Sequence, residues 1–299
     1  MPALLVHLTL AKDTAARGRD IPELGPAAAA EQPALLLGAI LPDLPYHARF
    51  GRQVVRHLLG RSYLSSKWGD IFHHRGTGRL ALALLAHIRR AHLPADERAQ
   101  VLALLAGYLS HLAVDTLLHP LIDRMVTQHI GPGEPLDVVH SRIERTQSLL
   151  FHRDRLGVDL AGSPHPRRMV SEVAGVRLLR PDLPEPLWAA VRAACLETHG
   201  RAPLRPQLRD WLWGIAAYGQ LMSSPLGRRE RLQGDLVALR TGFYQGEGVD
   251  LCSPLDRAVD RALEHWRAAL EVLQADRLGA EERERFQHQV PDVDLATGA

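Results

Sequence analysis

Residues 101–122, which read VLALLAGYLSHLAVDTLLHPLI, decide the fold of this chain. Apolar residues occupy most positions on every side of the expected helix, and a helix that is hydrophobic on all sides lies buried in a protein core or in a membrane. Two histidines and an aspartate interrupt the stretch at intervals of four residues, namely His111, Asp115 and His119. An aspartate at the centre of a bilayer costs about 2.5–3.5 kcal/mol to insert. We therefore expect a buried core helix and no transmembrane segment.

The composition of the whole chain favours α-helices and excludes disorder. Of its 299 residues, 46% are hydrophobic and 23% are charged, whereas only 5% are aromatic. Leucine and alanine supply most of the apolar residues, and both are strong helix formers. We predict an all-α fold in which residues 1–299 form a single bundle of around ten helices with a buried metal site. Residues 1–155 would hold the metal site, and residues 156–299 would complete the bundle.

Apolar periodicity and chain-breaking residues set the expected boundaries of the helices. The central helix should run from residue 95 to about His119, where Pro120 kinks it or begins a new turn. Prolines on both sides of Asp43 force a turn there. The glycine-rich stretch KWGDIFHHRGTG at 67–78 is typical of a loop. Further helices are expected at residues 3–16, 79–92 and 136–152.

The buried central helix carries a carboxylate that another group must neutralise, because burying an unpaired carboxylate is very unfavourable. His111, Asp115 and His119 project from one face of this helix, since residues four apart lie above one another. The next helix supplies His140 and Glu144 at the same spacing. Neutral imidazoles and carboxylates are zinc ligands, so two adjacent helices would bring all five side chains to a metal site.

Histidines concentrate in the same half of the chain, where 12 of the 16 lie within residues 1–152. Asp43 in its proline-flanked turn, and the pair His73 and His74, are placed to close the site from the side. Each of these motifs alone is more often a satisfied polar pair, a turn residue or a solvated loop. Together with the polar groups inside one apolar helix, they predict a buried metal centre.

The order of these residues resembles the bacterial zinc-dependent phospholipase C family. The resemblance covers about residues 1–150 and consists of His7, Asp43, His73-His74, His111-x3-Asp115 and His140-x3-Glu144. The last two motifs, in that order, are its most specific part. The resemblance implies an all-α architecture, which that family shares with zinc-dependent single-strand nucleases.

The resemblance also implies a cluster of zinc ions and assigns ligands to each. One ion is expected to be held by Asp43, His111, Asp115 and one of His73 and His74. We prefer His74 in that position, because HRGTG leads from it into the next helix. A second ion is expected to be held by His119, His140 and Glu144.

A third ion would be shared by His7 and Asp115, which makes Asp115 a bridge between metals. Secreted members of the family expose a tryptophan whose amine binds this third ion, whereas the present chain begins Met-Pro. His119 also follows Asp115 by only four residues, closer than the corresponding histidine in those members. We therefore expect two or three zinc ions.

The activity that the resemblance implies is zinc-dependent hydrolysis of phosphodiester bonds, as in a phospholipase C. Its substrate would be a phosphoester, phospholipids included, attacked at phosphorus by a metal-activated water. Asp43 would orient or deprotonate that water, and Asp115 would fix the separation of the metals. Arg75, beside the histidine pair, is a candidate phosphate clamp.

Two other classes of function stay open. A nuclease-like phosphodiesterase would need stacking aromatics and a basic groove for single-stranded nucleic acid. The net charge is only +2, and Trp211 and Trp213 lie in a helix with a core pattern, so nucleic acid is the less favoured partner. Alternatively, the chain is a non-catalytic helical domain that binds metal or a partner, in which case the metal would be sealed and fully ligated.

The start of the chain and its cysteines bear on the cellular compartment. The first residues, MPALLVHLTLAKD, lack the basic region of a secretory signal peptide. The two cysteines, Cys195 and Cys252, do not form a disulfide scaffold or a cysteine-based zinc site. We expect a cytoplasmic protein. The sequence does not determine its oligomeric state.

Overall fold

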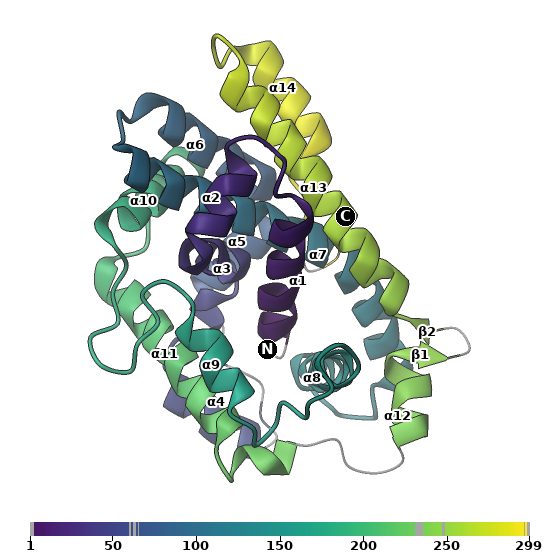
Figure 1. Cartoon of the computed structure of the whole chain (residues 1–299). Coiled ribbons are helices and arrows are strands. Elements are labelled where there is room, and N and C mark those ends of the chain that lie inside the picture. The colour runs from purple at the N-terminus through teal and green to yellow at the C-terminus, as the bar shows by residue number, and fades with distance from the viewer. Residues whose placement is uncertain are drawn as a thin grey trace.

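The structure is all-α, as the composition and periodicity predict. The computed structural model describes residues 3–59, 61, 64, 66–230, 236–246, 249–295 and 297. These residues form fourteen α-helices, two short 3₁₀ helices and one antiparallel pair of two-residue strands (Figure 1). The number of helices exceeds the expected ten because short helices occupy stretches that lack apolar periodicity.

The elements follow one another along the chain with short connections. In order they are α1 (Ala3–Arg17), α2 (Leu24–Ala30), α3 (Gln32–Ile40), η1 (Leu44–His47), α4 (Phe50–Leu58), α5 (Lys67–His74), α6 (Thr77–Arg90), α7 (Ala95–His129), α8 (Leu136–Leu156), α9 (His165–Ser171), α10 (Glu185–His199), α11 (Arg205–Ser223), η2 (Gly227–Glu230), α12 (Leu236–Phe243), β1 (Gln245–Gly246), β2 (Val249–Asp250), α13 (Cys252–Gln274) and α14 (Ala280–Gln289). Both halves of the sequence pack together, since α10 contacts α6 and α13 contacts α7.

Two of the short helices lie in stretches that lack apolar periodicity. Helix α2 contains four consecutive alanines, which favour a helix without giving an apolar stripe. Helix α5 lies in the stretch 67–78, so the expected loop there is wrong for its first eight residues. The hydroxyl of Ser66 accepts a hydrogen bond from the Gly69 backbone N–H at 3.2 Å and caps this helix. The histidine pair therefore lies on a helix, where the two side chains point in different directions.

Helix α7 runs through the centre of the molecule and is 35 residues long. Among the described helices it alone is long and apolar enough to cross a membrane, but 89% of its most apolar window is buried within the protein. Pro120 does not end it, and the expected stop near His119 is wrong. The helix continues because Ile122, Met125 and Val126 pack into an apolar cluster shared with α8, which outweighs one missing hydrogen bond.

Two glycines let α3 and α7 touch through their backbones. A Cβ on Gly38 would lie 2.0 Å from the carbonyl oxygen of Leu104, and a Cβ on Gly107 would lie 1.9 Å from that of Leu35. Any larger residue at either position would push the two helices apart. This contact sets the distance between α7 and the turn that follows α3, which carries Asp43.

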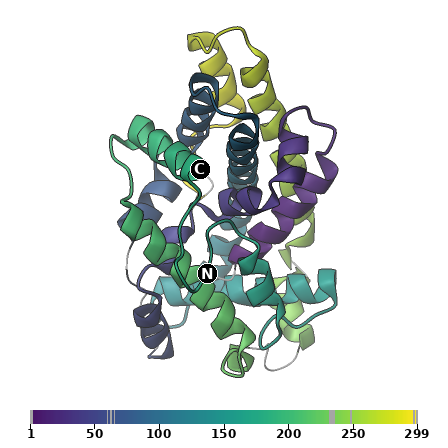
Figure 2. The same ribbon diagram turned by 60° about the vertical axis from the view of Figure 1, so that its left-hand side comes forward.

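The apolar core consists of two clusters that meet along α7. One cluster contains α7 residues up to Leu112 together with α3, α6, α10 and α11, and the other contains α7 residues from Val114 onward together with α8 and the start of α13. In Figure 1 and Figure 2 alike, α13 lies on the opposite side of the molecule from α10 and α11. His111 and Asp115 therefore lie where α7 passes from one cluster to the other.

Candidate metal centre

The structure brings eight of the nine predicted ligands together. They form three groups in which the candidate ligand atoms lie within 4.8 Å of one another. The groups are His7–His111–Asp115, Asp43–His73–His111 and His119–His140–Glu144. These side chains come from α1, the turn before η1, α5, α7 and α8, so the helical packing assembles the site from five places in the chain.

Asp115 lies at the middle of the site and is buried, with 3% of its side chain exposed. One of its carboxylate oxygens is 2.9 Å from Nε2 of His111, and the other is 3.1 Å from Nε2 of His7 and 3.6 Å from Nε2 of His119. Nε2 of His73 lies 3.7 Å from the carboxylate. A carboxylate with histidines around both oxygens has the arrangement that a bridging metal ligand needs.

Hydrogen bonds to the backbone orient two of these histidines. Nδ1 of His111 lies 2.9 Å from the carbonyl oxygen of Ala39, and Nδ1 of His73 lies 2.9 Å from that of Gly69. A carbonyl can only accept, so Nδ1 carries the proton, and in the neutral ring Nε2 then holds a lone pair. Backbone carbonyls commonly orient metal-binding histidines in this way.

Several buried nitrogen and oxygen atoms in the site lack a geometrically good hydrogen-bond partner among the described residues. Among the described residues, Nε2 of His111 and Oδ2 of Asp115 have no hydrogen-bond partner, although they are buried and 2.9 Å apart. The Nδ1 atoms of His7 and His119 are also buried and have no hydrogen-bond partner among the residues that the structure describes. Because unsatisfied buried acceptors are costly, a cation beside Nε2 of His111 and Oδ2 of Asp115 fits these ligand atoms.

The pKa shifts of the buried histidines and carboxylates also indicate that the site favours positive charge. Burial lowers the pKa of His111, but the negative charge of Asp115 outweighs burial and raises that pKa to about 9. Burial raises the pKa of Asp43, but the hydrogen bond with His73 and the nearby histidine charges lower it to about 2. The carboxylates are therefore ionised at neutral pH and require either protonated imidazoles or metal ions beside them.

The third group connects α7 with α8. Nε2 of His140 lies 3.2 Å from Glu144, and its Nδ1 lies 3.7 Å from Asp123, which places carboxylates at both ring nitrogens. The rings of His119 and His140 stack with centroids 5.4 Å apart. His119 thus lies between Asp115 and Glu144, one helical turn after Asp115 on α7.

His74 lies outside the groups, which corrects our preference for it over His73. Its side chain is 40% exposed, and its Nδ1 lies 2.8 Å from a carboxylate oxygen of Asp294. Successive residues on a helix point about 100° apart, so only one of the pair on α5 faces the site. Arg75 is exposed and is not among the residues that line the cavity described below, so the structure does not support the candidate phosphate clamp at Arg75.

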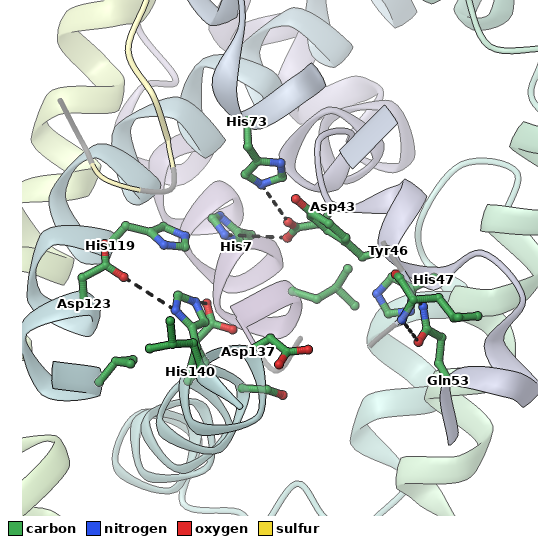
Figure 3. Close-up of a pocket in the computed structure, with 16 residues that line it drawn as sticks. His7, Asp43, Tyr46, His47, Gln53, His73, His119, Asp123, Asp137 and His140 are labelled. Carbon is green, nitrogen blue, oxygen red and sulfur yellow. Dashed lines mark hydrogen bonds and ion pairs between the residues drawn. The ribbon is translucent and has the colours of Figure 1, made fainter. Parts of the chain in front are cut away.

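A cavity of about 550 Å³ opens onto the site. In Figure 3, His7 and His73 point toward Asp43, and His140 points toward the neighbouring Asp123. Sequence reasoning missed several polar residues in its wall, because no spacing connected them with the metal motifs. They are Tyr46, His47, Gln53, Asp123 and Asp137.

His47 is the most buried of these wall residues. Burial lowers its pKa to about 3, so the ring is neutral. Its Nδ1 has no hydrogen-bond partner among the described residues, and the ring packs against Phe50 and Tyr218. It therefore contributes a neutral polar surface to the cavity without adding charge.

The fold and site define an all-helical protein with a buried histidine–carboxylate centre suited to several metal ions. A family model described as "Zinc dependent phospholipase C" matches residues 6–156, which include all eight clustered ligands. The match spans half of the chain, and the chain belongs to this family. No curated protein and no solved structure matches it significantly.

Proposed function

We propose that this protein is a zinc-dependent hydrolase of phosphodiester bonds, of the phospholipase C type. The observation that carries the proposal is the gathering of eight histidine and carboxylate side chains beside an open cavity, with Nε2 of His111 and Oδ2 of Asp115 buried and unsatisfied between them. Family membership makes zinc the expected metal. Bound zinc would acidify a water molecule and neutralise the charge on phosphate oxygens.

The two predicted catalytic carboxylates have different access to the cavity. Asp43 lines the cavity wall and is 20% exposed, with one oxygen 3.3 Å from Nε2 of His73. It can therefore orient an attacking water or accept its proton. Asp115 does not line this cavity and is almost completely buried, so we assign it the role of holding the metals in place.

The cavity extends well beyond the metal groups and favours an amphipathic substrate. Leu4, Val126 and Leu136 contribute apolar surface, while Asp137 and Ser141 contribute polar groups. A phosphate near Asp43 would leave room in the 550 Å³ for parts of the substrate on either side of it. Phospholipids combine a phosphodiester with apolar chains, and this composition supports them as the substrate class.

The same cavity argues against the two alternatives. None of the described residues that line it is an arginine or a lysine, and neither Trp211 nor Trp213 is among them, so it lacks the basic surface that single strands need. A purely structural metal would be sealed by its ligands. Here Asp43 and His140 keep 20% and 27% of their side chains exposed.

Metal content and hydrolysis measured on the same preparations test the proposal. The protein purified without added metal should contain two or three zinc ions and hydrolyse bis-p-nitrophenyl phosphate and phospholipid micelles. A chelator should abolish this activity and zinc should restore it, because the attacking water depends on the metal. Single-stranded DNA offered in parallel should be a poor substrate.

Asp115→Ala should lose zinc. Its kcat should also fall by more than about 10–100-fold, the loss expected when a residue that only hydrogen-bonds to a metal ligand is removed. Asp20→Ala, which removes an exposed aspartate outside the site, is the matched control and should change neither. Full activity in Asp115→Ala would overturn the proposed mechanism. Zinc-loaded wild-type protein that hydrolyses no phosphoester would favour the structural alternative.

A further inference from the structure

A segment near the end of the chain, far in sequence from the metal-site motifs, is hydrogen-bonded to the junction between α5 and α6. We call residues 290–295 the strap. The hydroxyl of Thr77 donates to the carbonyl oxygen of Val293 at 2.9 Å and accepts from its N–H at 3.0 Å. Arg79 donates from its backbone N–H and its Nε to the carboxylate of Asp292, at 2.8 and 2.6 Å. Four hydrogen bonds thus fix the strap against the start of α6.

The end of the strap holds the two histidines of α5. The N–H of Leu295 donates to the carbonyl oxygen of His73 at 2.7 Å, and Asp294 lies 2.8 Å from Nδ1 of His74. The side chain of Leu295 is completely buried in the larger apolar cluster. The carbonyl of His73 lies in the last turn of α5, where carbonyls have no partner within their own helix.

Helix α5 needs such support, because it has eight residues and isolated helices of that length are not stable in water. The strap fixes the backbone of His73, and the carbonyl of Gly69 fixes its Nδ1. Together these contacts direct Nε2 of His73 toward Asp43 at 3.3 Å and toward Asp115 at 3.7 Å.

We propose that Asp294 and Leu295 are positioning residues that set the metal affinity of the Asp43–His73–His111 group. This inference rests on the metal centre of the proposed function. The strap lies outside the residues 6–156 that match the family, so the contact is a property of this chain beyond the matched region.

Zinc affinity of three variants, measured by competition with a chelator, tests this role. Asp294→Ala removes the acceptor for His74, and Leu295→Ala removes the buried side chain. Each substitution should lower the zinc affinity of the Asp43–His73–His111 group about 10-fold, which is within the range for residues that hydrogen-bond to metal ligands. The zinc affinity of the His119–His140–Glu144 group should not change. Asp294→Asn retains an acceptor oxygen and should restore most of the wild-type affinity.

Asp154→Ala is the matched control, because it removes an aspartate that pairs with Arg240 at the surface. It should leave every zinc affinity unchanged. Thermal unfolding of the zinc-free variants separates positioning from general stability. If Leu295→Ala fails to fold, the comparison of Asp294→Ala with Asp294→Asn is enough to test the positioning role.

Unchanged zinc affinities in folded Asp294→Ala would overturn the inference and leave the proposed function intact. Equal weakening of all ions would also overturn it, because that result indicates loss of general stability. A wild-type protein that binds no zinc would refute the proposed function itself, and the inference with it.

Discussion

Gly107→Ala should both destabilise the protein and weaken its metal site. The new Cβ would lie 1.9 Å from the Leu35 carbonyl oxygen, whereas ordinary contacts begin at 3.4 Å. The helices α3 and α7 must therefore separate by about 1.5 Å, because packed backbones do not compress. Overpacking of this kind costs about 1–3 kcal/mol or more, which exceeds the gain of about 1 kcal/mol from replacing glycine within a helix.

The same separation would stretch the hydrogen bond from Nδ1 of His111 to the Ala39 carbonyl beyond hydrogen-bonding distance, from its present 2.9 Å. Loss of such an outer partner lowers metal affinity about 10–100-fold. Urea unfolding of the zinc-free protein and chelator competition measure the two effects separately. Gly51→Ala in α4 is the matched control, since its Cβ meets no atom within 4 Å and should be neutral or stabilising. A Gly107→Ala protein with the stability and the zinc affinity of the wild type would refute the reasoning.

Three other predictions concern protonation, Arg75 and the second metal group. The zinc-free protein should lose stability as pH rises from about 6.5 to 9. The folded-state pKa of His111 is raised to about 9, so the stability that comes from its bound proton is lost over that range. Thermal melts in chelator at several pH values would show the loss. Stability that rises over the same interval would contradict this sign. Arg75→Ala should keep kcat/KM within about twofold of wild type, since surface substitutions away from a site have small effects. His119→Ala should lower the zinc content by one ion and leave far-UV circular dichroism unchanged, and retention of every ion would exclude His119 as a ligand.

The parts of the site that sequence spacing predicts are those fixed by the geometry of a single helix. His111, Asp115 and His119 share one face of α7 because residues four apart do so in any α-helix. The same reasoning pairs His140 with Glu144 on α8. The apolar surroundings of Asp115 predicted its burial, and the structure confirms that burial.

The parts that spacing does not predict depend on contacts between distant segments. The choice between His73 and His74 depends on how α5 is oriented, and that orientation involves Asp294 and Leu295, more than 200 residues away. The continuation of α7 beyond Pro120 depends on packing against α8, which local propensity does not contain. The cytoplasmic location and the division of the domain at residue 155 stay predictions.

Anomalous X-ray diffraction at the zinc edge, from crystals grown without added metal, tests the central claim most directly. The account predicts two or three peaks among the clustered ligands, each about 2.0–2.2 Å from its histidine nitrogens and carboxylate oxygens. One peak should lie beside Nε2 of His111 and another between His140 and Glu144. A map with no peak among these side chains would contradict the account.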